Sequence, residues 1–231
     1  GYIRRDGETN PDNFVAHRHA MIRFSSIVGD LTSAWIVTKD EKYIVQALKH
    51  IRAWFIDPET RMNPDLQYAQ AIKGIVTGRG IGIIDTIHLL EVVQSLIVME
   101  QAGLLSCEDA VATKDWFSNY LYWLANHPYG KDEMNAKNNH GTCWVMQAAQ
   151  FAKYTGNREV IKQFCYRDRW IRMAVFRWNW REPNRTDILS SIWMLWQQCA
   201  ISFPMIQIIS GNIQRKTDGI CRKGWPGCAP I

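Results

Sequence analysis

The sequence predicts an all-α fold built from helical hairpins. Three observations support this prediction: apolar side chains recur at helical spacing through most of the first 165 residues, successive segments are separated by short turns, and no segment shows the alternation of a half-buried strand. Helices joined in pairs by short turns pack as stacked hairpins. The longer loops between pairs are then expected to gather at one end, where a cleft can form.

Five helices are expected, separated by turns or loops that contain glycine, proline or charged residues. They cover residues 14–38, 41–55, 81–102, 107–126 and 142–155. Lys39 and Asp40 make the turn inside the first hairpin, and Gly103 and Gly156 stand where a glycine commonly ends a helix. A loop that starts at Gly130 is expected to lead to the last helix.

Length and composition fit one sizeable globular domain. The chain has 231 residues, of which 47% are hydrophobic, and no apolar run is expected to span a membrane. The six cysteines and six histidines show no zinc-binding spacing, and His17 and His19 fall on different faces of their helix. We therefore expect no metal, no cofactor and no membrane partner. The polar start, residues 1–10, has no initiator Met and is expected to belong to a fragment.

The most informative motif is Asn138-Asn139-His140, which follows a charged stretch and precedes the last apolar-periodic segment. Asparagine is a common N-cap residue, so the motif is expected to cap that helix and to face whatever the helix end faces. An imidazole beside amide donors is also what proton abstraction next to a carboxylate requires. The motif alone leaves a capping role and a catalytic role open.

Six segments, in this order, resemble the alginate lyase family of bacterial polysaccharide lyases. They are Arg5-Asp6-Gly7 with Asn10-Pro11, residues 54–64 from Trp54 to Pro64, Tyr68-Ala69-Gln70, residues 78–86 from Gly78 to Thr86, Trp116-Phe117 with residues 120–124, and residues 138–142. The resemblance covers roughly residues 1–160. It implies an incomplete α/α toroid, in which helical hairpins surround a deep groove, and it agrees with the hairpins expected from periodicity.

The resemblance also implies an activity, which is the cleavage of 4-linked uronic acid polymers by β-elimination. By this resemblance Asn139 neutralises the substrate carboxylate and His140 is the catalytic base, while Asn138, Arg79, Tyr68 and Gln70 are candidates for substrate binding. The implied partner is an acidic polysaccharide such as alginate, rather than a nucleic acid or a membrane, and the implied location is the periplasm.

Several of these residues have a structural alternative. Arg79 could bind a uronate carboxylate or tie down its loop, and Tyr68 and Gln70 could line the groove or brace it. Asp85 and His88 are expected to share a structural hydrogen bond. Trp116 and Trp123 are expected to pack in the core rather than to stack on sugars.

Two other functions are open. A glycoside hydrolase with a helical ring would need two facing carboxylic acids, for which Asp85 with Asp132 or Glu133 could be proposed. A non-catalytic polyuronate-binding protein is the second alternative.

The composition changes beyond Cys165. Six of the eleven Trp residues lie there, and so do ten basic and four acidic residues, so this tail carries the whole positive balance of the chain. A shifted reading frame takes each codon from the last base of one residue and the first two bases of the next. In that frame the codons across Trp178-Asn179, Asn179-Trp180 and Trp193-Met194 can encode only Glu, Leu and Asp, respectively. Filling the flexible positions gives segments that resemble the C-terminal half of the family.

We therefore predict a one-base shift between about Cys165 and Trp170, with residues 1–165 forming a partial alginate lyase-like domain and residues 166–231 an out-of-frame, irregular tail. The family's Arg and Tyr, in a restored Ala-Arg-Thr-Lys-Pro-Tyr-Gly-Tyr segment, are absent from the chain as written. That polypeptide is expected to be inactive or nearly so.

Overall fold

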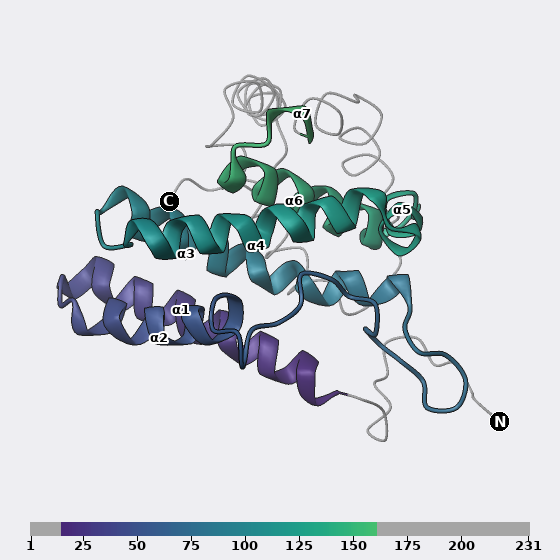
Figure 1. Cartoon of the computed structure of the whole chain (residues 1–231), viewed down its shortest axis with the longest axis horizontal. Coiled ribbons are helices and arrows are strands. Elements are labelled where there is room, and N and C mark those ends of the chain that lie inside the picture. The colour runs from purple at the N-terminus through teal and green to yellow at the C-terminus, as the bar shows by residue number, and fades with distance from the viewer. Residues whose placement is uncertain (1–14, 161–231) are drawn as a thin grey trace, which may run out of the picture. The chain divides into compact units, whose positions relative to one another are not determined.

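The structure is a computed structural model that describes residues 15–160 (Figure 1). These residues belong to the first of two units into which the chain divides, residues 1–178 and 179–231. The helices are α1 (Ala16–Thr38), α2 (Lys42–Phe55), the 3-10 helix η1 (Gly80–His88), α3 (Leu89–Gln101), α4 (Cys107–Asn126), α5 (Pro128–Met134), α6 (Asn139–Thr155) and α7 (Arg158–Val160). Residues 15–160 contain no strand, only an isolated bridge between Ile72 and Val76. The all-α prediction is confirmed.

The first helical hairpin forms as predicted. Lys39 adopts a left-handed conformation with φ of 59°, and Asp40 Oδ1 accepts a hydrogen bond from the backbone N–H of Lys42 at 3.1 Å. These two features end α1 and start α2 within a few residues. Helix α1 packs against both α2 and α3, and α4 packs against α6 (Figure 1).

Three helix predictions need correction. The segment predicted as one helix over residues 81–102 begins as the 3-10 helix η1, and the α-helix starts at Leu89. A short helix, α5, replaces the predicted loop after Gly130; Pro128 stands at its start, where the missing N–H of proline costs nothing. Helix α6 begins at Asn139, three residues earlier than predicted.

Aromatic side chains from α1, α2, α4 and α6 form the core. Phe24 stacks on Trp54 with ring centroids 4.6 Å apart, and Phe55 contacts Trp116 at the same separation. Trp116 is only 4% exposed, which confirms its predicted core role. Trp123 is half-buried and stacks on His127, with ring centroids 4.7 Å apart.

A paired charge joins the second and fourth helices. Arg52 in α2 donates two hydrogen bonds through Nε and Nη2 to the carboxylate of Asp109 in α4, the shorter of them 2.7 Å long. Asp109 is buried, while Arg52 keeps half of its side chain in solvent. This bidentate contact fixes the first hairpin against the helix that follows it.

Two apolar segments are longer than the sequence prediction allowed. Residues 16–38 and 80–101 are long and apolar enough to cross a membrane by length and composition, and an 18-residue stretch of each has a mean hydropathy of 1.2 and 1.7, respectively. Both pack against other helices, and half of that stretch in the second segment is buried. Buried core helices can be equally long and apolar, so the expected absence of a membrane partner stays a prediction.

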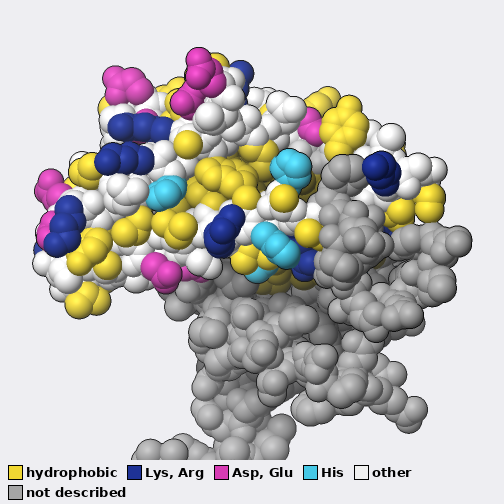
Figure 2. Space-filling view, turned by 90° about the horizontal axis from the view of Figure 1, so that it is seen from below, with side chains coloured by type: hydrophobic (Ala, Val, Ile, Leu, Met, Phe, Trp, Pro, Cys, Tyr) yellow, Lys and Arg dark blue, Asp and Glu magenta, His cyan; other side chains and the backbone are white. Residues whose placement is uncertain are grey.

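Hydrophobic side chains also reach the surface. Ile36, Val37 and Val45 are exposed near the turn of the first hairpin. Figure 2 shows hydrophobic side chains gathered over the middle of one face, with histidines beside them and most charged side chains toward the edge. The predictions for residues 1–11 and for the tail after residue 165 lie outside the described residues.

Candidate active site

Asn138 is the N-cap of α6, as predicted. Its side-chain Oδ1 accepts a hydrogen bond from the backbone N–H of His140 at 3.1 Å, which satisfies one of the free donors at the helix start. Asn139 and His140 therefore lie in the first helical turn and not in the preceding loop. Asn138 is exposed, Asn139 is partly exposed and the His140 side chain is 22% exposed, so all three are accessible from outside the core.

The His140 imidazole is held by a carboxylate from the neighbouring helix. Its Nδ1 is hydrogen-bonded to Oε1 of Glu133 in α5, and the Glu133 side chain is only 4% exposed. The two helices can approach this closely because residue 141 is glycine. A Cβ built on Gly141 would lie 2.3 Å from the backbone oxygen of Ala136, far inside van der Waals contact.

A second group of polar side chains surrounds Gln70. Arg79 donates through Nε to the backbone oxygen of Gln70 at 2.9 Å, and Gln70 donates through Nε2 to Asp85 at 2.9 Å. Arg18 in α1 forms an ion pair with the other carboxylate oxygen of Asp85 at 2.9 Å. Gln70 itself has φ of 49°, a conformation that non-glycine residues rarely adopt. The network holds Gln70 in this conformation.

These contacts bear on the alternatives left open by the sequence. Arg79 braces the loop through Gln70, although a guanidinium has five donors and two hydrogen bonds to Gln70 leave others for a ligand. Asp85 is paired with Arg18 and Gln70, so the expected hydrogen bond to His88 is wrong, and His88 is exposed. Tyr68 is 72% exposed and lies at the surface of the same loop.

The two groups are connected through α5. The hydroxyl of Tyr129, at the start of α5, donates to the backbone oxygen of Gly78 at 2.9 Å. Gly78 directly precedes Arg79, while Glu133 holds His140 from the same helix. One short helix that the sequence did not predict therefore links the loop bearing Gln70 and Arg79 to the start of α6.

A buried hydrogen-bond network fixes α6 further along its length. Thr86 Oγ1 lies 2.6 Å from Gln147 Oε1 and 2.7 Å from the Tyr120 hydroxyl. Thr86 Oγ1 also lies 2.8 Å from the Ile83 backbone oxygen, and both that oxygen and the Gln147 oxygen can only accept, so they share the single Thr86 proton and Tyr120 donates to Thr86. Burial raises the pKa of Tyr120 far above its usual range, so the phenol keeps its proton. The network joins η1, α4 and α6 at Gln147, about two turns beyond the start of α6.

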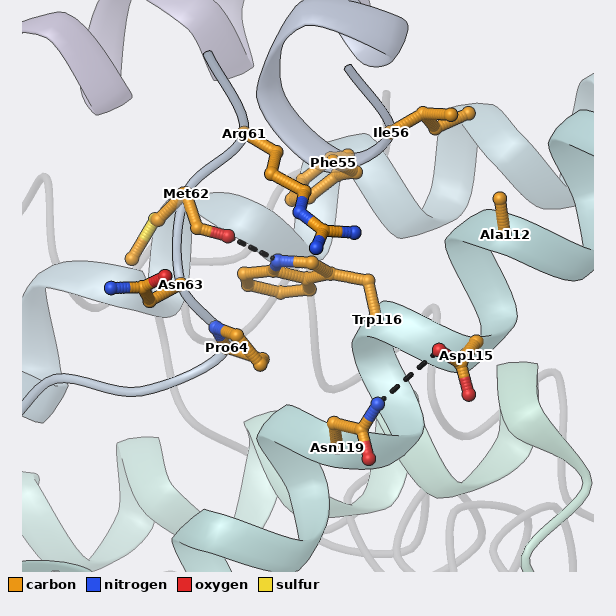
Figure 3. Close-up of a pocket in the computed structure, with 10 residues that line it drawn as sticks. All are labelled: Phe55, Ile56, Arg61, Met62, Asn63, Pro64, Ala112, Asp115, Trp116 and Asn119. Carbon is orange, nitrogen blue, oxygen red and sulfur yellow. Dashed lines mark hydrogen bonds between the residues drawn. The ribbon is translucent and has the colours of Figure 1, made fainter. Parts of the chain in front are cut away.

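A separate cavity of about 280 Å³ lies between the C-terminal end of α2, the loop over residues 61–64 and α4 (Figure 3). Figure 3 shows the Arg61 guanidinium beside the indole of Trp116, whose Nε1 donates to the Met62 backbone oxygen at 2.7 Å. None of the predicted site residues lines this cavity. The chemistry described here therefore lies elsewhere in the described part of the chain.

The geometry combines an accessible imidazole, amide groups and a buried carboxylate at one helix end. This set can abstract a proton and bind an anion. It does not supply the facing pair of carboxylic acids that a glycoside hydrolase needs, because Glu133 is bound to His140, and Asp85 is bound to Arg18 and Gln70. Within residues 15–160, no three His, Cys, Asp or Glu side chains are grouped as metal ligands.

Glu133 is the main site residue whose role the sequence did not predict. The sequence suggests Glu133 only as one acid of a hydrolase pair, whereas in the structure Glu133 in α5 contacts His140 in α6. Side-chain spacing predicts contacts within one helix, but Glu133 and His140 lie in two different helices. The sequence therefore indicates this contact only through the presence of a carboxylate shortly before the Asn-Asn-His motif.

Comparison with known proteins bears on the family and on the fold. The sequence profile of the family described as alginate lyase matches residues 1–175. The chain is similar to the crystal structure of an alginate lyase from Bacteroides ovatus at 1.60 Å resolution, with 34% sequence identity and a TM-score of 0.65. That similarity covers 71% of this chain and 44% of the Bacteroides ovatus chain, so this chain spans less than half of its length. No curated protein matches significantly. The likeness of structure fits the predicted helical toroid. The family match covers about three-quarters of the chain and includes every residue of the candidate site, and the chain belongs to the alginate lyase family.

Proposed function

We propose that the in-frame form of this protein cleaves 4-linked polyuronates, with alginate as the first candidate, by β-elimination at the start of α6. The observation that carries the proposal is the His140 imidazole, accessible at its helix end and held by a buried carboxylate. The family supports the polysaccharide lyase class; the activity, the substrate, the reacting residues and a periplasmic location are our proposals.

The chemistry requires a neutralised carboxylate before a proton can leave. The proton on C5 of a uronate is not acidic while the adjacent carboxylate keeps its charge. The Asn139 side-chain amide donates to that carboxylate, and the positive end of the α6 dipole favours the same anion. The His140 imidazole then takes the C5 proton, the electron pair forms the C4–C5 double bond, and the bond from C4 to the bridging oxygen breaks.

The leaving oxygen must receive a proton, which the family's Tyr supplies. Neither this Tyr nor the accompanying Arg is present in the chain as written, since both fall in the segment that a one-base shift would restore. The proposed function therefore concerns the restored protein. The origin of the tail stays a prediction that the nucleotide sequence across the codons for Cys165 to Trp170 would decide.

The test is formation of unsaturated uronate, which absorbs in the ultraviolet and which a hydrolase does not produce. In the restored protein, His140→Ala and Asn139→Ala are each expected to lower kcat by roughly two or more orders of magnitude. His50→Ala and Asn135→Ala are matched controls, because His50 is partly exposed, Asn135 is exposed, and each side chain bonds only to a residue four positions earlier. Turnover like the unmodified enzyme in either site variant would remove that residue from the mechanism.

A further inference from the structure

Glu133 is placed to decide which nitrogen of His140 can act as a base. Its carboxylate contacts Nδ1 and not Nε2. An ionised carboxylate can only accept a hydrogen bond, so the proton of a neutral imidazole must then sit on Nδ1. The lone pair is left on Nε2, at the opposite side of the ring.

Glu133 also offsets an unfavourable position of the imidazole. His140 lies in the first turn of α6, where the helix dipole and the free N–H groups disfavour a cation. A base that takes a proton becomes an imidazolium at this same place. The dipole acts through partial charges, whereas Glu133 supplies a full negative charge in direct contact, so the carboxylate dominates.

The surroundings hold this pair rigidly. Glu133 is nearly fully buried, and Gly141 in α6 lies close to the backbone oxygen of Ala136, which follows α5, and to that of Glu133 itself. Its neighbour Asp132 carries the same charge but is exposed. The geometry is that of a base oriented by a second, buried group.

We propose that Glu133 is a positioning residue that holds His140 in the Nδ1-protonated tautomer and so directs Nε2 toward the C5 proton. The catalytic part of this inference rests on the proposed function; the tautomer does not. After transfer, the C5 proton resides on Nε2 and the imidazolium keeps its Nδ1 hydrogen bond to Glu133.

The tautomer can be measured on the full chain without any activity. Selective ¹⁵N labelling of histidine gives six imidazoles, and the signals lost in His140→Ala identify the one of interest. While His140 is neutral, we expect a protonated Nδ1 and an unprotonated Nε2. Glu133→Gln is expected to shift the population toward protonated Nε2, because an amide can donate as well as accept. Asp132→Asn, which removes a neighbouring charge without touching the contact, is expected to leave the signals unchanged.

A His140 with protonated Nε2 in the unmodified chain would overturn the proposal, and so would identical signals in Glu133→Gln. Glu133→Asp serves as the second variant: it keeps the charge but withdraws the carboxylate by one methylene, and we expect an intermediate shift. Unchanged signals in Glu133→Asp together with an unfolded Glu133→Gln would also overturn it.

In the restored enzyme, Glu133→Gln is expected to lower kcat at least tenfold with little change in KM, and Glu133→Asp to recover part of that loss. An unchanged kcat in Glu133→Gln contradicts the catalytic part of the inference. Absence of lyase activity in every variant, the unmodified restored enzyme included, refutes the proposed function and leaves the tautomer measurement to decide the role of Glu133.

Discussion

Replacing Gly141 by alanine is expected to separate Glu133 from His140. The new Cβ would stand 2.3 Å from the Ala136 backbone oxygen, and ordinary contact begins near 3.4 Å, so the first turn of α6 must retreat by about 1 Å. The obstacle is backbone and cannot swing aside as a side chain would. A displacement of about 1 Å at a reacting group can cost about a hundredfold in rate.

The effect on stability is expected to be smaller than the effect on rate. Overpacking a close contact costs about 1–3 kcal/mol, while alanine is favoured over glycine inside a helix by about 1 kcal/mol. The free energy of unfolding should therefore fall by about 0–2 kcal/mol, which urea unfolding followed by circular dichroism can resolve. In the restored enzyme kcat should fall by about two orders of magnitude.

Gly29→Ala is a suitable control. Gly29 also lies inside a helix, but the atom nearest its added Cβ, at 2.7 Å, belongs to the flexible Glu91 side chain. This variant is expected to keep full activity and stability near that of the unmodified protein. A Gly141→Ala enzyme with unchanged kcat would refute the argument that the α5–α6 contact positions the base.

Two further predictions concern other parts of the described chain. The hydrogen bond from Arg52 lowers the pKa of Asp109 in the folded protein. The pair therefore stabilises the fold fully at pH values above about 4, the pKa of Asp in the unfolded chain. This stabilisation is lost as the pH falls through the lower pKa of Asp109 in the folded protein. Asp109→Asn should therefore make the thermal unfolding midpoint depend less on pH below about 4, and an equally steep dependence would contradict this. Burial raises the pKa of the Cys143 thiol to about 12, so in the native chain at neutral pH an alkylating reagent should modify the exposed Cys107 and spare Cys143, as peptide mass mapping can check. Equal labelling of the two would show that the start of α6 opens readily.

Local patterns predicted most of the helices. The turn at Lys39, the helix end at Gly103 and the cap at Asn138 depend on neighbouring residues only, and all three were predicted. The same holds for α4, whose predicted bounds are those observed. Such features are encoded by residues close in sequence, so a single sequence suffices to find them.

The errors arise where distant contacts decide the conformation. The 3-10 winding of η1 occurs where Gly82 lies against Ala69 and where Thr86 joins a buried network with Tyr120 and Gln147. None of these contacts is visible in the periodicity of residues 80–88. Helix α5 was missed because seven residues are too few for a periodic signal.

The candidate site shows the same division. Asn138, Asn139 and His140 were predicted because they are adjacent and of unusual type, whereas the contact from Glu133 depends on how two helices meet. The pairing of Asp85 with Arg18 is a contact between residues 67 positions apart, and it displaced the expected local partner, His88. Residue types at one helix end can therefore be predicted from the sequence, but the partners that orient them require the fold.

In the proposed reaction His140, at the start of α6, removes the C5 proton of a polyuronate. The most direct measurement is ultraviolet absorbance during incubation of alginate with three proteins: the restored enzyme, its His140→Ala variant and the chain as written. We expect unsaturated product from the restored enzyme alone. Equal product from the restored enzyme and its His140→Ala variant would contradict the assignment of the base, and equal product from the chain as written would contradict the predicted shift of frame.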